Sequence, residues 1–345
     1  GVEKRSKVRS RIVADQLVKL IKEADHVVIM GHRMSDLDAI GSAEGVLRIC
    51  KICDVPAVIA VKRDATLAGS LIDALCRAGQ RDDFIDPKEA LPIISKQTLC
   101  VVVDTYQVGL VESKEILEKC GKVAVIDHHR KGVGYIENPA LVCHEPYSSS
   151  ASELVTELLQ YVGDRDDKPN RVEAEGLLSG IMLDTQDFTL HTGVRTFEAA
   201  AALRRYGAET ERVRQLFDVT MTEYNAKADL VEKAQMYKNC AISVGGEIAP
   251  EARVAIAQAA NDLLRIQGVD ASFVAVQVSG GVNISARSLG AVNVQVIMES
   301  LGGGGHQTMA AAQLKHITPE AVRSRIETAI DNYWASQKKS SAAEK

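Results

Sequence analysis

Short apolar runs, each followed within two residues by an acidic residue or a histidine, constrain the fold of this chain more than any other feature. The runs at 26–30, 99–103 and 122–126 are rich in Val and Ile, and stretches of helical periodicity separate them. Buried strands that alternate with helices are typical of a parallel sheet covered by helices on both faces. We therefore expect an α/β fold in the N-terminal half.

The same pattern predicts how the 345 residues divide into domains. Residues 1–205 form the first domain, with the parallel sheet. Residues 206–235 are charged, helical and without a dense apolar run, so we expect a helical connector. Strand-like runs and helices alternate again over residues 236–345, which predicts a smaller C-terminal α/β domain.

Composition excludes several classes of function. The formal net charge of −5 gives no broad attraction for long nucleic acid, so we expect none as a partner. The seven cysteines are scattered without framework spacing, which indicates a reducing compartment. No stretch of about 20 apolar residues is present, so we expect no membrane contact within this sequence.

Polar residues gather where the apolar runs end, and the carboxyl ends of parallel strands are where such sheets bind ligands. Singly, each has an ordinary alternative: Asp36 could cap a helix and Asp38 could lie in its first turn. Together they predict a site for a divalent cation, because carboxylates with imidazoles suit manganese, iron or zinc better than calcium. The residues at this predicted edge are His32, Asp36, Asp38, Asp104, Asp127, His128, His129 and Asp184.

A second set of residues, in the C-terminal domain, suits phosphate. The glycine run at 302–305 gives backbone amides access to an anion, and Arg287 offers a guanidinium. A flexible loop and a surface charge on an edge strand are the ordinary alternatives. The predicted substrate-binding residues are Arg287, Gly303, Gly304, Gly305 and His306.

These motifs, taken together, carry a resemblance to a known family. His-x-x-x-Asp-x-Asp at 32–38, Asp104, Asp-His-His at 127–129, Asp184 and Gly-Gly-Gly-His at 303–306 resemble the DHH phosphoesterase superfamily. The segments 29–41, 189–198 and 293–306 are more closely similar to the catalytic part of cyclic di-AMP phosphodiesterases of the GdpP type. The resemblance runs from about residue 8 to residue 314.

The resemblance implies an N-terminal DHH domain, a C-terminal DHH-associated domain and two divalent metal ions, with manganese first and iron or cobalt as alternatives. One ion is then held by His32, Asp36 and Asp104, and the other by Asp38, Asp104, His128 and Asp184. Asp104, His128 and His129 become the catalytic residues.

The implied reaction is the hydrolysis of cyclic di-AMP to linear pApA by a metal-activated water, so the expected partner is a cyclic dinucleotide. The family also makes a homodimer plausible. Its members carry membrane helices upstream, so we expect a soluble fragment from the cytoplasmic face of a membrane-anchored protein. The alternatives are a nuclease for short oligonucleotides, of the nanoRNase or RecJ kind, and a nucleotide-sensing module without activity.

Overall fold

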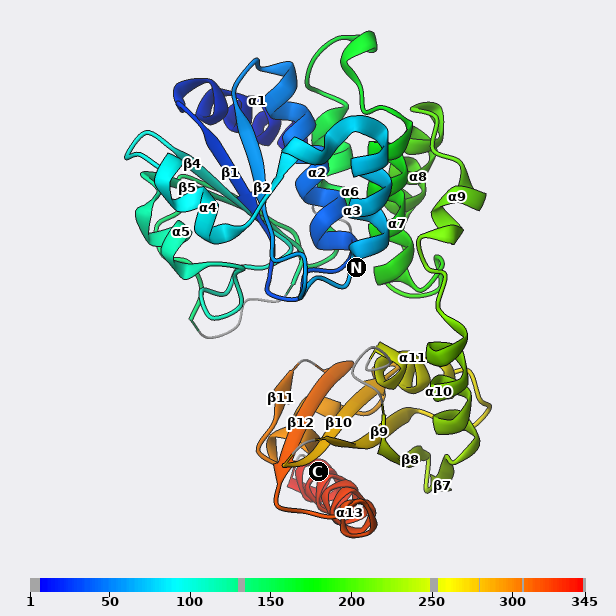
Figure 1. Cartoon of the computed structure of the whole chain (residues 1–345). Coiled ribbons are helices and arrows are strands. Elements are labelled where there is room, and N and C mark those ends of the chain that lie inside the picture. Colours follow the sequence, from blue (N-terminus) through cyan, green and yellow to red (C-terminus); the bar gives the residue numbers. More distant parts are fainter. Residues whose placement is uncertain (1–6, 130–133, 249–253, 279, 306, 344–345) are drawn as a thin grey trace. The chain divides into compact units, whose positions relative to one another are not determined.

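The computed structural model describes residues 7–129, 134–248, 254–278, 280–305 and 307–343 (Figure 1). The chain forms two compact units, residues 1–218 and 219–345. The segment predicted as a connector, 206–235, is divided between them. Helix α9 (Thr210–Gln215) belongs to the first unit, where Val213 is fully buried, and α10 (Met221–Glu232) to the second, where Leu230 is fully buried.

The first unit contains a six-stranded sheet in the order β3-β2-β1-β4-β5-β6, and every neighbouring pair is parallel. This confirms the predicted parallel sheet. The edge strands β3 and β6, which are short, were not predicted. The strands are β1 (Val27–Met30), β2 (Ala57–Ala60), β3 (Phe84–Ile85), β4 (Leu99–Val103), β5 (Lys122–Asp127) and β6 (Leu141–His144).

Helices cover both faces of this sheet (Figure 1). Alternate strand residues face opposite sides: Val27 and Ile29 belong to one core, and Val28 and Met30 to another. The first core is closed by α1 (Lys7–Glu23), α2 (Leu37–Ile52), α6 (Ala151–Leu159), α7 (Arg171–Thr185), α8 (Val194–Arg205) and α9. The second is closed by α4 (Pro87–Ala90) and α5 (Lys114–Lys119).

Helix α3 (Gly69–Leu75) continues as one turn of π-helix over Cys76–Gln80, where Gly79 adopts a φ of 92°. The positive φ at Gly79 ends the helix, because a right-handed helix requires negative φ. This turn brings the Gln80 side chain into a buried position, where it donates a hydrogen bond to Glu173 at 3.0 Å.

The strand order places a topological switch point between β1 and β4. From β1 the chain builds outward through β2 and β3, and it then returns to the other side of β1 to add β4, β5 and β6. Loops that leave β1 and β4 at a switch point diverge, which opens a crevice at their carboxyl ends. The residues that follow β1, β4 and β5 are therefore the ones that can meet a ligand.

The second unit contains a mixed sheet in the order β11-β12-β10-β9-β8-β7, in which only β8 and β9 are parallel. Helices α12 and α13 cover one face, and α10 with α11 covers the other face over β8 and β9. The remaining elements are α11 (Val254–Leu263), α12 (Val294–Glu299), α13 (Pro319–Ala343), β7 (Gln235–Tyr237), β8 (Cys240–Glu247), β9 (Ala271–Val278), β10 (Gly281–Ser288), β11 (Gly304–Gly305) and β12 (Met309–Lys315).

Helix α13, with 25 residues, is the longest of the described helices. Its buried residues Val322, Ile326 and Ile330 recur at helical spacing, so one face packs on the sheet while the opposite face carries charged and polar side chains. Within the described ranges, no helix combines the length and the apolar character needed to cross a lipid bilayer.

Candidate metal centre

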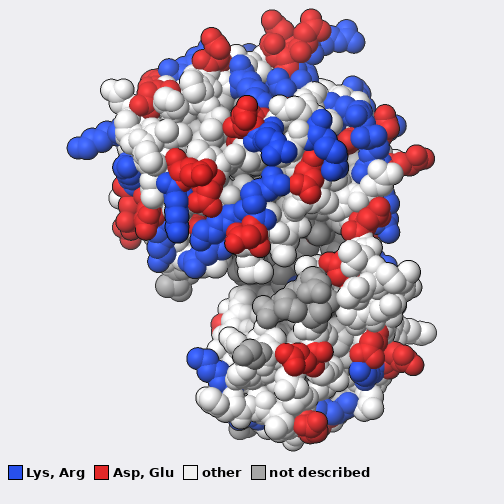
Figure 2. Space-filling model, in the orientation of Figure 1, with Lys and Arg blue, Asp and Glu red and all other residues white. Residues whose placement is uncertain are grey.

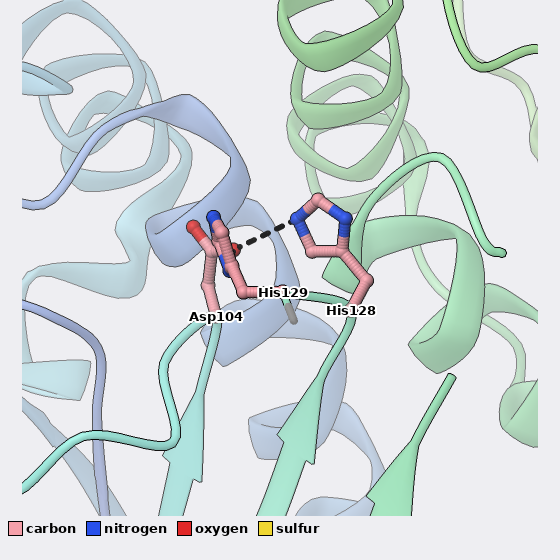
Figure 3. A group of neighbouring side chains, drawn as sticks. All are labelled: Asp104, His128 and His129. Atoms are coloured by element: carbon pink, nitrogen blue, oxygen red, sulfur yellow. Dashed lines mark ion pairs between the residues drawn. The ribbon is translucent and has the colours of Figure 1, made fainter. Parts of the chain in front are cut away.

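The ends of three parallel strands bring the first ligand candidates together. His32 lies two residues after β1, Asp104 directly follows β4, and His128 directly follows β5. His32 Nε2 lies 3.3 Å from Asp104 Oδ2, and His128 Nε2 lies 3.3 Å from Asp104 Oδ1. Figure 3 shows His128 directed at Asp104 from the neighbouring strand, with His129 beside them. The expectation that these side chains meet at one sheet edge is therefore met.

Asp104 is the central residue of this arrangement. It is 3% exposed, and its φ of 58° lies in the left-handed region, where Asp is tolerated better than most side chains. Its backbone amide donates to the carbonyl of Ile126 at 2.9 Å, which fixes the turn against β5. Because each carboxylate oxygen faces a different imidazole, Asp104 can serve two ligand groups at once.

The first group, called the His32 group below, consists of His32, Asp36 and Asp104, whose ligand atoms lie within 4.8 Å of one another. His32 Nδ1 donates to the carbonyl of Arg33 at 2.9 Å, and a carbonyl can only accept, so Nδ1 carries the proton. His32 Nε2 therefore faces the carboxylates, 3.7 Å from Asp36 Oδ1, where it can hold either a proton or a metal ion. This is the arrangement of a metal-ligating histidine.

Asp36 also caps a helix, which was the alternative explanation for an aspartate at this position. It is the N-cap of α2, and its Oδ1 accepts hydrogen bonds from the amides of Asp38 and Ala39, both at 3.0 Å. Capping leaves the carboxylate further lone pairs, so it does not exclude metal binding. The cap fixes Asp36 next to His32 as part of the fold.

The second group, called the His128 group, consists of Asp38, Asp104, His128 and Asp184. His128 Nε2 lies 3.0 Å from Asp184 Oδ2 and 3.8 Å from Asp38 Oδ2. Asp38 is fully buried, and its carboxylate accepts from the amides of Ala151 at 2.7 Å and Ser152 at 2.8 Å. The group thus combines strand-end residues with residues from helices α2 and α7.

Asp184 reaches this edge from the last turn of α7 and not from a strand. Helices α2 and α7 cross with almost no space between their backbones, because each has glycines four residues apart on the contact face. A Cβ built on Gly41 would lie 2.4 Å from the carbonyl oxygen of Gly176. This close crossing brings Asp38, at the start of α2, beside Asp184, at the end of α7.

His129 is held by the residue that begins the Asp-His-His motif. The Asp127 carboxylate lies 2.8 Å from His129 Nδ1 and accepts from its backbone amide at 3.2 Å. A carboxylate can only accept, so His129 Nδ1 is the donor. The side chain of His129 is 39% exposed, against 13% for His128. His129 is therefore the more accessible imidazole, and Asp127 sets its orientation.

The pKa values of the ligand candidates reflect the contacts between imidazoles and carboxylates in the site. Burial disfavours a charge on His32, but Asp104 and Asp36 outweigh burial and raise its pKa to about 12. Burial is outweighed in the same way at His128, whose pKa is raised by Asp104 and Asp184. The pKa of Asp104 is lowered despite its burial, because His128 and His32 stabilise the carboxylate. The imidazoles thus stay protonated to balance buried carboxylates, and a divalent cation could take the place of these protons.

Two buried polar atoms of the site lack hydrogen-bond partners in the part of the chain that the structure describes. His128 Nε2 and Asp104 Oδ1 are buried, and within the described residues neither has a hydrogen-bond partner, although they lie 3.3 Å apart. Buried polar atoms in folded proteins normally have a partner. A cation between them would supply one to both. The acidic and imidazole groups are therefore positioned for a metal site, as the sequence predicted.

Arg287, which the sequence predicts to bind substrate, lies on β10 of the second unit. Its Nη1 donates to Ser285 Oγ at 3.0 Å and to the carbonyl of Ala286 at 2.9 Å. Its Nε is buried and lacks a hydrogen-bond partner among the described residues, and burial lowers the pKa of Arg287 to about 10. The guanidinium keeps a free donor for an anion. His306 lies outside the described residues.

The predicted glycines have a packing role of their own. Gly304 and Gly305 form β11, which pairs with β12. A Cβ on Gly303 would lie 2.1 Å from the carbonyl oxygen of Ala311, and one on Gly305 would lie 2.5 Å from Ala310 Cα. These glycines let the backbone approach β12 closely, so the flexible-loop alternative does not describe them. Their contact with phosphate stays a prediction.

Figure 2 shows the charged side chains on one face of the molecule. Lys and Arg are intermixed with Asp and Glu over the first unit, and the second unit carries fewer charged side chains on this face.

Comparison with known proteins assigns the family. Residues 26–181 match the model described as the DHH family, N-terminal domain, and residues 249–335 match the DHHA1 domain. The chain carries a DHH domain followed by a DHHA1 domain. The predicted family is confirmed, and every ligand candidate of the metal centre lies in the first domain or, for Asp184, three residues beyond its matched range.

Two curated relatives cover nearly the whole chain. It is 45% identical over 338 residues to the cyclic-di-AMP phosphodiesterase GdpP of Geobacillus thermodenitrificans, and 42% identical over 338 residues to the cyclic-di-AMP phosphodiesterase PdeA of Listeria monocytogenes. Each alignment takes in 96% of this chain and 51% of the relative. The chain thus spans about half the length of these relatives.

A solved structure shares the fold. It is an exopolyphosphatase-related protein from Bacteroides fragilis, which superimposes with a TM-score of 0.80 at 21% sequence identity and covers 95% of this chain and 98% of its own. At that identity the likeness shows the fold alone, and it supports the predicted combination of a parallel-sheet domain with a smaller α/β domain.

Proposed function

We propose that this chain is a metal-dependent phosphodiesterase that hydrolyses cyclic di-AMP to linear pApA. The observation that carries the proposal is the position of Asp104, whose two oxygens join the His32 group to the His128 group. Two relatives at 45% and 42% identity are named for this substrate. The two ligand groups support metal-dependent hydrolysis, and the names of these relatives support cyclic di-AMP as the substrate.

The residues fit two divalent cations, and manganese is the ion we propose. The His32 group would hold one ion and the His128 group the other, with Asp104 shared between them. Oxygen and imidazole donors in this ratio suit manganese, with iron and cobalt as alternatives. When bound, such a pair activates water for attack on phosphorus and offsets the charge that develops on the phosphoryl oxygens.

The chain's own groups then orient the reaction. Asp127 holds the His129 imidazole in one orientation, and this side chain, which is 39% exposed, can contact a phosphoryl oxygen at the rim of the site. Asp104, fixed by its backbone bond to Ile126, keeps the two ligand groups in register. Orientation of this kind lowers the barrier because the groups need no rearrangement during the reaction.

Arg287 is the proposed anchor for substrate in the second unit. Its buried Nε has no partner among the described residues, and a phosphate oxygen would satisfy it with a charge-assisted hydrogen bond. The glycines at 303–305, with amides close to β12, are proposed to contact the same phosphate. Truncating Arg287 should therefore raise KM more than it lowers kcat.

The test is product analysis with manganese on three substrates: cyclic di-AMP, pApA and a short RNA. We expect cyclic di-AMP to be the preferred substrate, by kcat/KM, and pApA to be the product. A preference for short RNA would replace the proposal with the nuclease alternative. Tight binding of cyclic di-AMP without any hydrolysis would favour the sensing module.

A further inference from the structure

Three helices meet around the carboxylate of Asp38. This residue lies in the first turn of α2, is fully buried, and faces both the start of α6 and the end of α7. A buried carboxylate needs partners that hold it in place, because water cannot solvate it there. The contacts of Asp38 therefore decide where this member of the His128 group lies.

The N-terminus of α6 supplies those partners. Ala151 N donates to Asp38 Oδ2 at 2.7 Å, and Ser152 N donates to Asp38 Oδ1 at 2.8 Å. Two consecutive backbone amides thus bind both carboxylate oxygens. A negative charge is favoured at the start of a helix, where amides are free and the dipole is positive. Asp38 Oδ2 also lies 3.8 Å from His128 Nε2, so the hydrogen-bonded carboxylate is still next to the metal site.

Gly180 on α7 lies against the Asp38 carboxylate and the start of α6. A Cβ built there would lie 2.7 Å from Asp38 Oδ1, 2.8 Å from Asp38 Cα and 2.3 Å from Ser152 Oγ. Contacts under 3.0 Å force a shift, and two of these atoms belong to Asp38, one of them in the backbone. Any side chain at position 180 would therefore move Asp38 or lift it off the amides of α6.

We propose that Gly180 is a positioning residue of the metal centre. By lacking a side chain it lets α7 press Asp38 against the N-terminus of α6, and it thereby sets the distance between Asp38 and Asp184 in the His128 group. The inference rests on the proposed function, since it assumes that this group holds an ion. It adds a residue that binds no metal but decides whether one of the two sites can form.

The same crossing contains a matched control. A Cβ on Gly45, of α2, would lie 2.5 Å from Val155 Cγ1 and 3.1 Å from a methyl of Leu177, and its three nearest atoms are side-chain carbons of the core. Gly45→Ala therefore disturbs the packing of α2 without meeting Asp38. It should reduce stability and leave the metal centre unchanged.

The experiment is a calorimetric titration of manganese into the metal-free chain of 345 residues, with folding checked by circular dichroism. Gly180→Ala should weaken the ion of the His128 group by roughly tenfold or more, the usual cost of losing an outer-shell support. The ion of the His32 group should bind as in the unmodified protein. Gly45→Ala should melt at a lower temperature and bind both ions normally.

The inference is overturned if Gly180→Ala binds two ions with unchanged affinities, or if Gly45→Ala loses the same ion to the same extent. Failure of the unmodified chain to bind two ions would instead contradict the proposed function. If Gly180→Ala does not fold, Ser152→Ala in the same chain removes the atom nearest to the new methyl. That double variant should fold and still bind one ion tightly, and two tight ions in it would refute the inference.

Discussion

Two clusters of buried carboxylates in the described part of the first unit differ in the groups that balance their negative charge. In the metal centre, Asp104 and its neighbours face imidazoles, which can exchange a proton for a metal ion. The second cluster, called the Glu44 cluster, lies between α2, α7 and the π-helical turn. It consists of Glu44, Arg48, Gln80, Asp83 and Glu173.

The Glu44 cluster already contains its cation. Arg48 forms two hydrogen bonds with Glu173, at 2.6 and 2.8 Å, and Gln80 donates to Glu44 and Glu173. Glu44 Oε2 is buried without a partner among the described residues, just as Asp104 Oδ1 is. An unpartnered buried oxygen is therefore not enough to indicate a metal. Converging imidazoles make the difference, and the predictions below test that distinction.

The largest effect is expected from Asp104→Ala. Both ligand groups lose a member, so manganese binding should fail at both sites. Turnover should fall by more than the roughly 10–100-fold that loss of an outer-shell partner costs. Metal content and cyclic di-AMP hydrolysis measure the two effects. Glu44→Gln is the matched control, since it removes a buried carboxylate from the other cluster and should keep both ions. Near-normal metal content in Asp104→Ala would contradict the shared position.

Arg48→Met should have the next largest effect, and it should fall on stability alone. Glu173 is fully buried, so removing its partner leaves a buried charge uncompensated, at a cost of about 3 kcal/mol in the free energy of unfolding. Urea denaturation measures this loss. Adding Glu173→Gln should restore part of it. Loss of manganese binding by folded Arg48→Met would show that the clusters are not independent.

Asp127→Asn should reduce turnover by roughly 10–100-fold and leave both ions bound, because Asp127 orients His129. The expected signature is a lower kcat with manganese stoichiometry unchanged. Asp83→Asn, in the Glu44 cluster, is the control and should retain full turnover. Unchanged activity in Asp127→Asn would show that the orientation of His129 does not matter.

The smallest effect concerns pH and the Glu44 cluster. Burial, with the charges of Glu173 and Asp83, raises the pKa of Glu44 to about 8. The folded chain then holds a proton that the unfolded chain releases near pH 4.5, so this stability is complete below pH 4.5 and is lost as the pH rises through 8. Between pH 6 and pH 9 the loss should be roughly 2–3 kcal/mol.

Glu44→Gln should flatten this dependence, as measured by urea denaturation in chelator at both pH values. The exposed residue Glu232 on α10 gives the control variant, Glu232→Gln, which should keep the slope of the unmodified chain. An equal slope in Glu44→Gln and the unmodified chain would assign the pH dependence to another group.

The sequence predicted the strand-end half of the metal centre, because a parallel sheet places the carboxyl ends of its strands at one edge. His32, Asp104 and His128 follow directly from that rule. The strand β3 was missed because its two residues are too few to show a signal of period two. The edge strand β6 was missed although it is as long as β1. The domain boundary also differed, since the burial of Val213 and Leu230 depends on long-range packing.

The helix-borne half could not be predicted in the same way. Asp184 was a candidate on its sequence context, but its approach to Asp38 depends on the crossing of α2 and α7. The glycines that permit the crossing, at 41, 45, 176 and 180, are separated by more than 130 residues between the two helices. The α6 amides that bind Asp38 could not be predicted from the sequence, because nearly every residue type has a backbone amide. Glycines four residues apart in both helices were the one visible sign.

The most direct test of the account is to follow cyclic di-AMP hydrolysis while manganese is added stepwise to the metal-free chain. The account predicts two bound ions per chain, with turnover to pApA rising only as the second site fills. Full turnover with one ion bound, or in excess chelator, would contradict the assignment of Asp104 as the residue shared by two sites.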